Sequence, residues 1–178
     1  MLQVFGFERI GVLVGDLYFV NPRPEPGQEG PEQGVRLELR VLDRGELPGS
    51  IYSAQAVGIG RPLWRVDLLE SVDRPGSLDR AHHHPRFDGW EPGPRCFGAE
   101  LSADPRGWLA DRLAALAAVL HAAGARPDDA GPGDTAGVAG AAPDILRSVD
   151  RLLVMARTAD RSAVPPPAAG TAVRTGWL

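Results

Sequence analysis

Apolar and charged residues alternate strictly over residues 35–41, which read Val-Arg-Leu-Glu-Leu-Arg-Val. Successive side chains of a β-strand point to opposite faces of its sheet. The alternation therefore predicts a strand that has one buried face and one solvated face, and it is the clearest strand signal in the chain.

Strands are also predicted on both sides of this segment. Apolar residues are dense over 2–10, 12–14 and 17–20, and Gly15-Asp16 between two of these runs is a typical hairpin signal. Residues 51–57 predict a weaker strand that is rich in small side chains. Together these segments indicate an antiparallel sheet in the N-terminal half of the chain.

The strand predicted over 63–69 brings two opposite charges to one face. Trp64, Val66 and Leu68 share one side of such a strand, whereas Arg65 and Asp67 share the other. Exposed ion pairs of this kind are common and weak. We therefore expect Arg65 and Asp67 to form a pair on the sheet surface, with a functional role as the alternative.

A helix is predicted over 105–123. Asp104 is a suitable N-cap, Pro105 suits the first helical position, and Gly124 is a typical stop. Leucines at 109, 113, 116 and 120 follow the spacing of one helix face. We predict an α+β domain over 1–124, in which this helix covers the antiparallel sheet.

Residues 125–142 are rich in Gly, Ala and Pro and predict a flexible linker. An amphipathic helix follows over 143–157, and its apolar stripe includes Ile145, Val149 and Leu152. A stripe of this kind needs a partner, so we expect it to dock on its own domain, on a second copy in a homodimer, or on another protein. Residues 158–178 predict a disordered tail.

Composition narrows the class of protein. The 178 residues carry a net charge of -4, which argues against a broad nucleic-acid or membrane surface, although a local patch remains compatible with it. The single cysteine, Cys96, excludes an intramolecular disulfide. We find neither a signal-peptide pattern at the start nor a membrane-spanning apolar run, and we expect a cytoplasmic protein.

Candidate chemistry is concentrated in residues 79–90, which hold three of the four histidines. Pro85 disfavours a helical conformation for His84, so the run is expected to be extended. An extended run sends His82 and His84 to one side and His83 to the other.

Three interpretations of these histidines remain open. Acid–base chemistry would use His82, His83 and His84, with Asp79, Arg80 and Arg65 as the surrounding charged groups. A divalent metal would use His82 and His84, with Asp79, Asp88 or Glu91 completing the ligand set. The third interpretation is a proline-bounded loop whose imidazoles bind backbone groups and pack on Trp90 and Trp108.

Residues 78–85, which read Leu-Asp-Arg-Ala-His-His-His-Pro, resemble the aspartate and paired-histidine-proline segment of small bacterial TumE-type toxins. The resemblance spans about residues 51–90, and the wider pattern is similar to proteins of GC-rich bacteria. It implies a nucleic-acid-directed toxin activity, with Asp79, His83 and His84 at the matching positions. Residues 89–92, Gly-Trp-Glu-Pro, replace the second His-His element of that pattern.

The sequence thus favours a toxin-like protein that performs histidine acid–base chemistry on RNA. The alternatives are a non-catalytic interaction module that acts through its C-terminal helix and a metal-binding enzyme that uses His82 and His84.

Overall fold

The computed structural model describes residues 1–21, 23–24, 26–159 and 173–176. Its centre is an antiparallel sheet in the order β1-β2-β3-β4-β5, and β8 pairs with the far end of β2. The strands of this sheet are β1 (Leu2–Gly6), β2 (Ile10–Val20), β3 (Pro31–Arg44), β4 (Val57–Ser71), β5 (His82–His84) and β8 (Val173–Gly176). A separate short hairpin is formed by β6 (Phe87–Asp88) and β7 (Glu91–Pro92).

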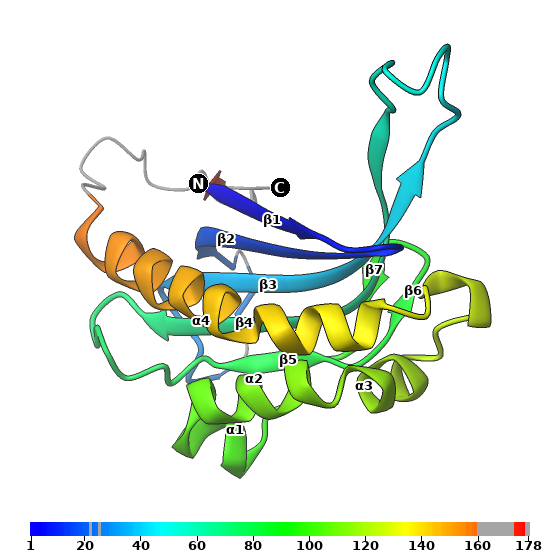
Figure 1. Ribbon diagram of the computed structural model, residues 1–178. Coiled ribbons are helices and arrows are strands. Elements are labelled where there is room, and N and C mark those ends of the chain that lie inside the picture. The colour runs from blue at the N-terminus through cyan, green and yellow to red at the C-terminus, as the bar shows by residue number, and fades with distance from the viewer. Residues whose placement is uncertain (22, 25, 160–172, 177–178) are drawn as a thin grey trace.

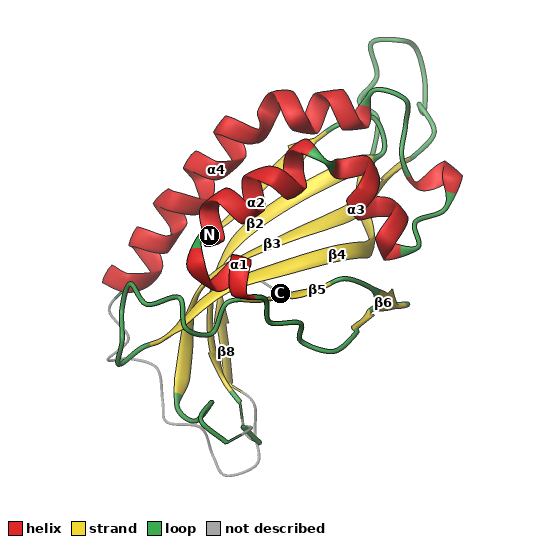
Figure 2. Cartoon of the chain, turned by 90° about the horizontal axis from the view of Figure 1, so that it is seen from below, coloured by secondary structure: helices red, strands yellow, loops and turns green. Residues whose placement is uncertain are grey.

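The helices cover one face of this sheet (Figures 1 and 2). They are α1 (Ala99–Ala103), α2 (Pro105–Ala114), α3 (Leu116–Ala123) and α4 (Asp134–Thr158), with a 3-10 turn η1 (Pro127–Asp129) before α4. This arrangement confirms the predicted α+β class. None of the helices in the described ranges combines the length and the apolar character needed to cross a bilayer.

The predicted alternation of the central strand sets the core. Val35, Leu37, Leu39 and Val41 are buried and pack with the apolar side chains of the helices. Trp64 of β4 stacks on Trp108 of α2 with ring centroids 5.9 Å apart. Stacked aromatic pairs of this kind stabilise more than their buried area alone. The inward face of the sheet is therefore the core, and Arg65 and Asp67 lie on the opposite face.

The first hairpin does not turn at Gly15-Asp16. Both residues lie inside β2, where Gly15 pairs with Leu2 on one side and with Arg36 on the other. The turn lies between Gly6 and Ile10 instead, and the Phe7 N–H donates to the Ile10 carbonyl. Pairing with its neighbours keeps β2 extended through a dipeptide that favours turns in isolation.

The weaker strand predicted over 51–57 is also absent from the described structure. Residues 45–56 form the connection between β3 and β4, which projects beyond the sheet (Figure 1). Ile51 and Tyr52 are 82% and 91% exposed there. Apolar side chains alone did not make this segment a strand, because no neighbouring strand pairs with it.

The predicted helix over 105–123 forms as two helices with a break at Ala115. The Asp104 side chain accepts a hydrogen bond from the Gly107 N–H, as expected of an N-cap. Gly124 ends α3 in the left-handed conformation, at a φ of 74°. The leucine face of the prediction is retained, since Leu109, Leu113, Leu116 and Leu120 are all buried.

The segment predicted as a linker, 125–142, is largely ordered. It contains η1 and the first part of α4, which begins at Asp134 and includes Pro143 within the helix. Val138 is fully buried, and a Cβ on Gly137 would lie 2.8 Å from the Phe7 ring. The small residues of this segment therefore allow close packing against the first hairpin, whereas their composition had suggested flexibility.

Asp134 joins the start of α4 to the β1–β2 turn. Its carboxylate accepts hydrogen bonds from the backbone N–H groups of Glu8 and Arg9 at 2.8 and 3.2 Å. The Glu8 carboxylate accepts in return from the Gly133 N–H at 3.1 Å. This reciprocal contact satisfies backbone donors that would otherwise be unpaired at the turn and at the helix start.

The apolar stripe of α4 docks on its own domain. Ile145, Val149 and Leu152 are at most 2% exposed and belong to the core. The Arg157 guanidinium also donates two hydrogen bonds of 2.9 Å to the buried Glu70 carboxylate. These three stripe residues are thus not available to a homodimer or protein partner, which corrects that part of the prediction. In the predicted tail over 158–178, β8 is a strand, and residues 160–172 and 177–178 lie outside the described residues.

Candidate functional site

The face of the sheet opposite the helices carries two rows of polar side chains. Strand register places Arg36 of β3, Asp67 of β4 and His82 of β5 side by side in the first row. The second row is formed by Glu38, Arg65 and His84 in the same order of strands. On β3 and β4 each charged residue has an oppositely charged neighbour, both across the strands and along its own strand. This alternation favours close cross-strand pairing.

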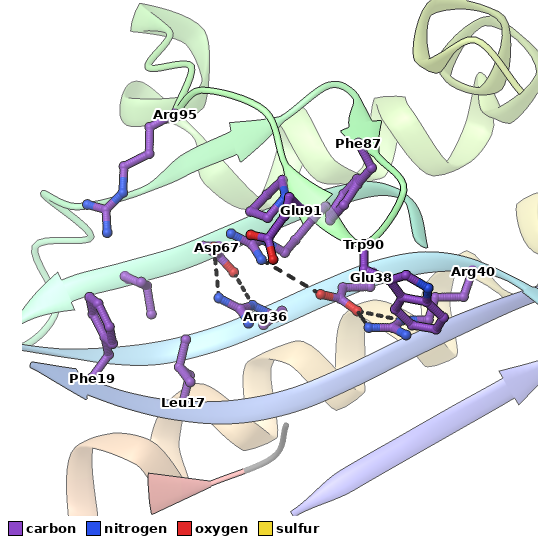
Figure 3. Close-up of a pocket in the computed structure, with 13 residues that line it drawn as sticks. Leu17, Phe19, Arg36, Glu38, Arg40, Asp67, Phe87, Trp90, Glu91 and Arg95 are labelled. Carbon is purple, nitrogen blue, oxygen red and sulfur yellow. Dashed lines mark hydrogen bonds and ion pairs between the residues drawn. The ribbon is translucent and has the colours of Figure 1, made fainter. Parts of the chain in front are cut away.

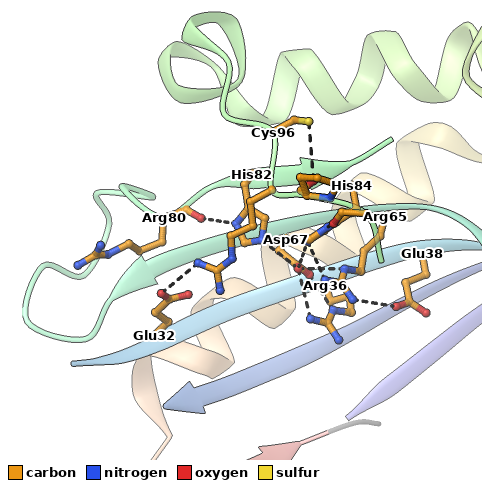
Figure 4. Close-up of polar contacts among 12 residues, drawn as sticks. Glu32, Arg36, Glu38, Arg65, Asp67, Arg80, His82, His84 and Cys96 are labelled. Carbon is orange, nitrogen blue, oxygen red and sulfur yellow. Dashed lines mark hydrogen bonds and ion pairs between the residues drawn. The ribbon is translucent and has the colours of Figure 1, made fainter. Parts of the chain in front are cut away.

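Asp67 is the centre of this arrangement (Figure 4). Arg36 donates to both of its carboxylate oxygens, at 2.7 and 3.3 Å. Arg65 Nε lies 3.1 Å from Asp67 Oδ2, and the Nε2 atoms of His82 and His84 lie 3.4 and 3.7 Å from the same oxygen. We refer to these five residues as the Asp67 cluster.

Asp67 remains ionised although it is 1% exposed. Burial raises the pKa of this carboxyl, but the charge of Arg36, the hydrogen bond from His82 and the charge of Arg65 together lower it well below its usual range. A buried carboxylate is stable only when it is paired in this way. The pair predicted to lie on the sheet surface is therefore buried inside the cluster.

Hydrogen bonds fix the proton of His84. Its Nδ1 donates to the Gly93 carbonyl at 2.6 Å, and its Nε2 accepts from Arg65 Nη2 at 2.7 Å, because a guanidinium can only donate. Burial and the nearby charge of Arg65 lower the pKa of His84 to about 4. His84 is therefore neutral near pH 7, and its free electron pair is already bound by Arg65.

His82 is held from the other side of its ring. Its Nδ1 lies 2.8 Å from the Arg80 carbonyl and donates to it, so its Nε2 faces Asp67. The His82 and His84 rings meet edge to face with centroids 5.0 Å apart. Both imidazoles lie beneath the guanidiniums, and both are less than 5% exposed.

His83 faces the opposite side of the sheet, as an extended run predicts. Its ring packs at 5.1 Å from the Trp108 ring and at 6.4 Å from the Trp64 ring. Burial, Arg112 and His82 lower the pKa of His83. The structure therefore separates His83 from the Asp67 cluster, although the resemblance to toxins had paired it with His84.

The side chains of Asp79 and Arg80 also lie apart from the Asp67 cluster. The Asp79 carboxylate accepts from the Ser71 N–H at 2.9 Å and from Arg74 at 2.6 Å, so it organises the turn between β4 and β5. The Arg80 guanidinium donates to the Gly27 carbonyl in the connection between β2 and β3. Of the six predicted site residues, the structure brings together His82, His84 and Arg65.

The metal hypothesis acquires a different third ligand. Asp67, His82 and His84 each offer one atom, and these atoms lie within 4.8 Å of one another. Asp79, Asp88 and Glu91 are not part of this group. Arg36 and Arg65 already bind the Asp67 carboxylate, however, and Arg65 binds the Nε2 of His84. A divalent cation would have to displace a guanidinium, so the residues fit their present arginine partners better than a metal.

A pocket of about 330 Å³ lies over the Asp67 cluster (Figure 3). The β6–β7 hairpin supplies Phe87, Trp90 and Glu91 to one wall, and Leu17 and Phe19 of β2 lie on another side. The floor and sides carry four guanidiniums, from Arg36, Arg40, Arg65 and Arg95, together with the carboxylates of Glu38 and Asp67. We refer to this space as the arginine pocket.

Sequence reasoning missed most of the arginine pocket. The alternation of Arg36, Glu38 and Arg40 was visible, but it indicated a solvated face. These side chains are largely covered, with Glu38 only 3% exposed.

Comparison with models of known protein families, with curated protein sequences and with solved structures gave no match.

Proposed function

We propose that this protein binds RNA or a nucleotide in the arginine pocket, and that the histidines of the Asp67 cluster position its guanidiniums. One observation carries the proposal. Arginine donors and aromatic rings face the same pocket, whereas His82 and His84 lie behind them. Guanidiniums bind phosphate oxygens, and aromatic rings stack on bases that are not paired in a duplex.

The Arg36 guanidinium has a donor that the Asp67 cluster does not use. Arg36 uses Nε and Nη2 on Asp67, and its Nη1 forms no hydrogen bond with the described residues. Arg65 is more fully engaged, because its Nε lies 3.1 Å from Asp67 Oδ2 and its Nη2 donates to His84 Nε2. A phosphate oxygen that entered the pocket would accept from Arg36 Nη1, and hydrogen bonds between charged groups are among the stronger ones in proteins.

A positioning role suits the histidines better than proton transfer. His84 is neutral near pH 7, and its Nε2 is occupied by Arg65. Neither it nor His82 is exposed enough to touch a ligand in the pocket. The resemblance of residues 79–85 to TumE-type toxins also implies a nucleic-acid ligand, but toxin activity is not part of this proposal.

Fluorescence anisotropy with a labelled single-stranded RNA of mixed sequence tests the proposal on the full chain. We expect Trp90→Ala and Arg40→Gln to weaken binding about tenfold, since loss of one stacking ring costs about 1–3 kcal/mol per base. Tyr52→Ala and Arg147→Gln are matched controls, because both residues are exposed and lie outside the pocket. Thermal melting should show all four variants folded.

Equal affinity of the wild type and all four variants would overturn the proposed pocket. The same RNA, recovered after incubation and separated on a gel, should be intact. Cleavage that disappears in His82→Ala would instead assign acid–base chemistry to the cluster and contradict the positioning role.

A further inference from the structure

Two aromatic rings give the arginine pocket flat walls. Trp90 lies in the turn of the β6–β7 hairpin, beside Gly89, whose φ of 59° suits a glycine in a tight turn. Trp90 is 61% exposed, and the Arg40 guanidinium lies over its ring at 5.3 Å. Arg65 lies 5.8 Å from the Phe87 ring centroid. Such walls accept a planar ring of any base and do not choose between bases.

The edge of the pocket carries acceptors as well as donors. Glu91 lines the pocket, and among the described residues no hydrogen bond or ion pair involves its carboxylate. Figure 3 shows it turned into the pocket above β4. The Glu38 carboxylate is paired within the pocket, since its Oε2 accepts from Arg40 Nε at 2.7 Å and its Oε1 lies 3.9 Å from Arg65 Nη1. A ligand that carried only phosphate would be repelled by the Glu91 carboxylate.

The mixture of charges matches one nucleobase. Guanine presents acceptors at O6 and N7, which a guanidinium binds, and it presents donors at N1 and N2, which a carboxylate binds. Adenine and cytosine each offer a single exocyclic amino group, and uracil offers none. A site built around a hydrogen-bonding group strongly rejects a ligand that lacks the matching atoms.

We infer that the arginine pocket selects guanine, with Glu91 accepting from the N1–H and N2–H groups while an arginine donates to O6 and N7. This inference rests on the proposed nucleotide binding and names its base. Trp90 supplies the stacking face, and Glu91 is a specificity-determining residue.

Titration calorimetry with the four nucleoside monophosphates and with inorganic phosphate tests the selection. We expect guanosine monophosphate to bind about tenfold more tightly than each of the other three, which a good bidentate contact can supply. Glu91→Gln keeps the shape of the side chain but removes one acceptor, so it should abolish this preference. Glu46→Gln is the matched control, because Glu46 is exposed in the β3–β4 connection.

The outcomes separate the two proposals. Absence of binding by any nucleotide would overturn the proposed function. Binding of all four monophosphates with equal affinity, or a guanine preference that survives in Glu91→Gln, would overturn the selection by Glu91 and leave nucleotide binding intact. Trp90→Ala should weaken all four nucleotides to a similar degree, and binding of inorganic phosphate alone as tightly as any nucleotide would contradict base recognition.

Discussion

His84 connects two parts of the molecule through the two nitrogens of one ring. It binds the Gly93 carbonyl in the segment after β6–β7 and the Arg65 guanidinium in β4. Only the neutral ring can do both, because a protonated Nε2 would face a guanidinium. Protonation of His84 should therefore break the link between the sheet and the segment that covers it.

This gives a pH dependence with a definite sign. The pKa of His84 is about 4 in the folded protein and 6.5 as a free group, so between these values the unfolded chain binds a proton that the folded chain does not. Stability should therefore fall as the pH is lowered from 6.5 to 4, by up to about 3 kcal/mol for this residue. Urea unfolding of the wild type and His84→Gln at pH 7, 5.5 and 4.5 measures the effect.

In His84→Gln the amide oxygen can still accept from Arg65, but the side chain does not titrate. The loss of stability with falling pH should be smaller in this variant by a similar amount. Parallel curves for the two proteins would show that His84 is not the responsible group. His83, whose pKa is also lowered, adds to the slope of both proteins equally.

At the scale of single residues, the sequence predicted the direction in which side chains point better than it predicted their burial and partners. Alternation along an extended run separates His83 from His82 and His84, and it places Arg65 beside Asp67. Burial of that pair depends on residues 85–98 folding back over β4, and Arg36 reaches Asp67 only through the register of β3. Both depend on contacts between distant segments, which a local pattern does not contain.

Among the elements, α4 packs on the sheet through the apolar face that its amphipathic pattern predicted. Leu152 is fully buried between the helix and the sheet, whereas Val154, two residues later, is 58% exposed. Leu152→Ala should lower the free energy of unfolding by about 2–5 kcal/mol because it leaves a cavity. Val154→Ala should change it by less than about 0.5 kcal/mol. Chemical denaturation of both variants makes the comparison.

Equal costs for the two substitutions would mean that α4 does not rest on the sheet through this face.

The stripe and its need for a partner were predictable from spacing. The start of the helix was not predictable from spacing, because the glycines and alanines over 131–142 are typical of a linker. Their packing against Phe7 and Glu8 depends on a distant segment of the chain. The two-residue strands β6 and β7 gave no periodic signal at all, yet they carry a wall of the pocket.

At the scale of the whole molecule, the net charge of -4 opposes the approach of an anion, so any nucleotide must be held by local contacts. A pocket that binds one or two phosphates should release few counterions. We expect the logarithm of RNA affinity to fall with the logarithm of salt concentration with a slope between about -0.7 and -1.4. Anisotropy titrations between 50 and 300 mM salt measure it, and a slope several times steeper would indicate a broad cationic surface.

The contact between Asp134 and the β1–β2 turn has a consequence for the order in which the chain folds. The residues that it joins are 126 positions apart. The first hairpin is therefore synthesised long before Asp134, which accepts hydrogen bonds from its turn. Contacts between such distant positions form slowly, because closing a long loop costs conformational entropy before the contact stabilises the chain. A ribosome-bound chain that ends before residue 134 would therefore carry a first turn whose Glu8 and Arg9 N–H groups lack their acceptor, and a sheet whose core face lacks α4.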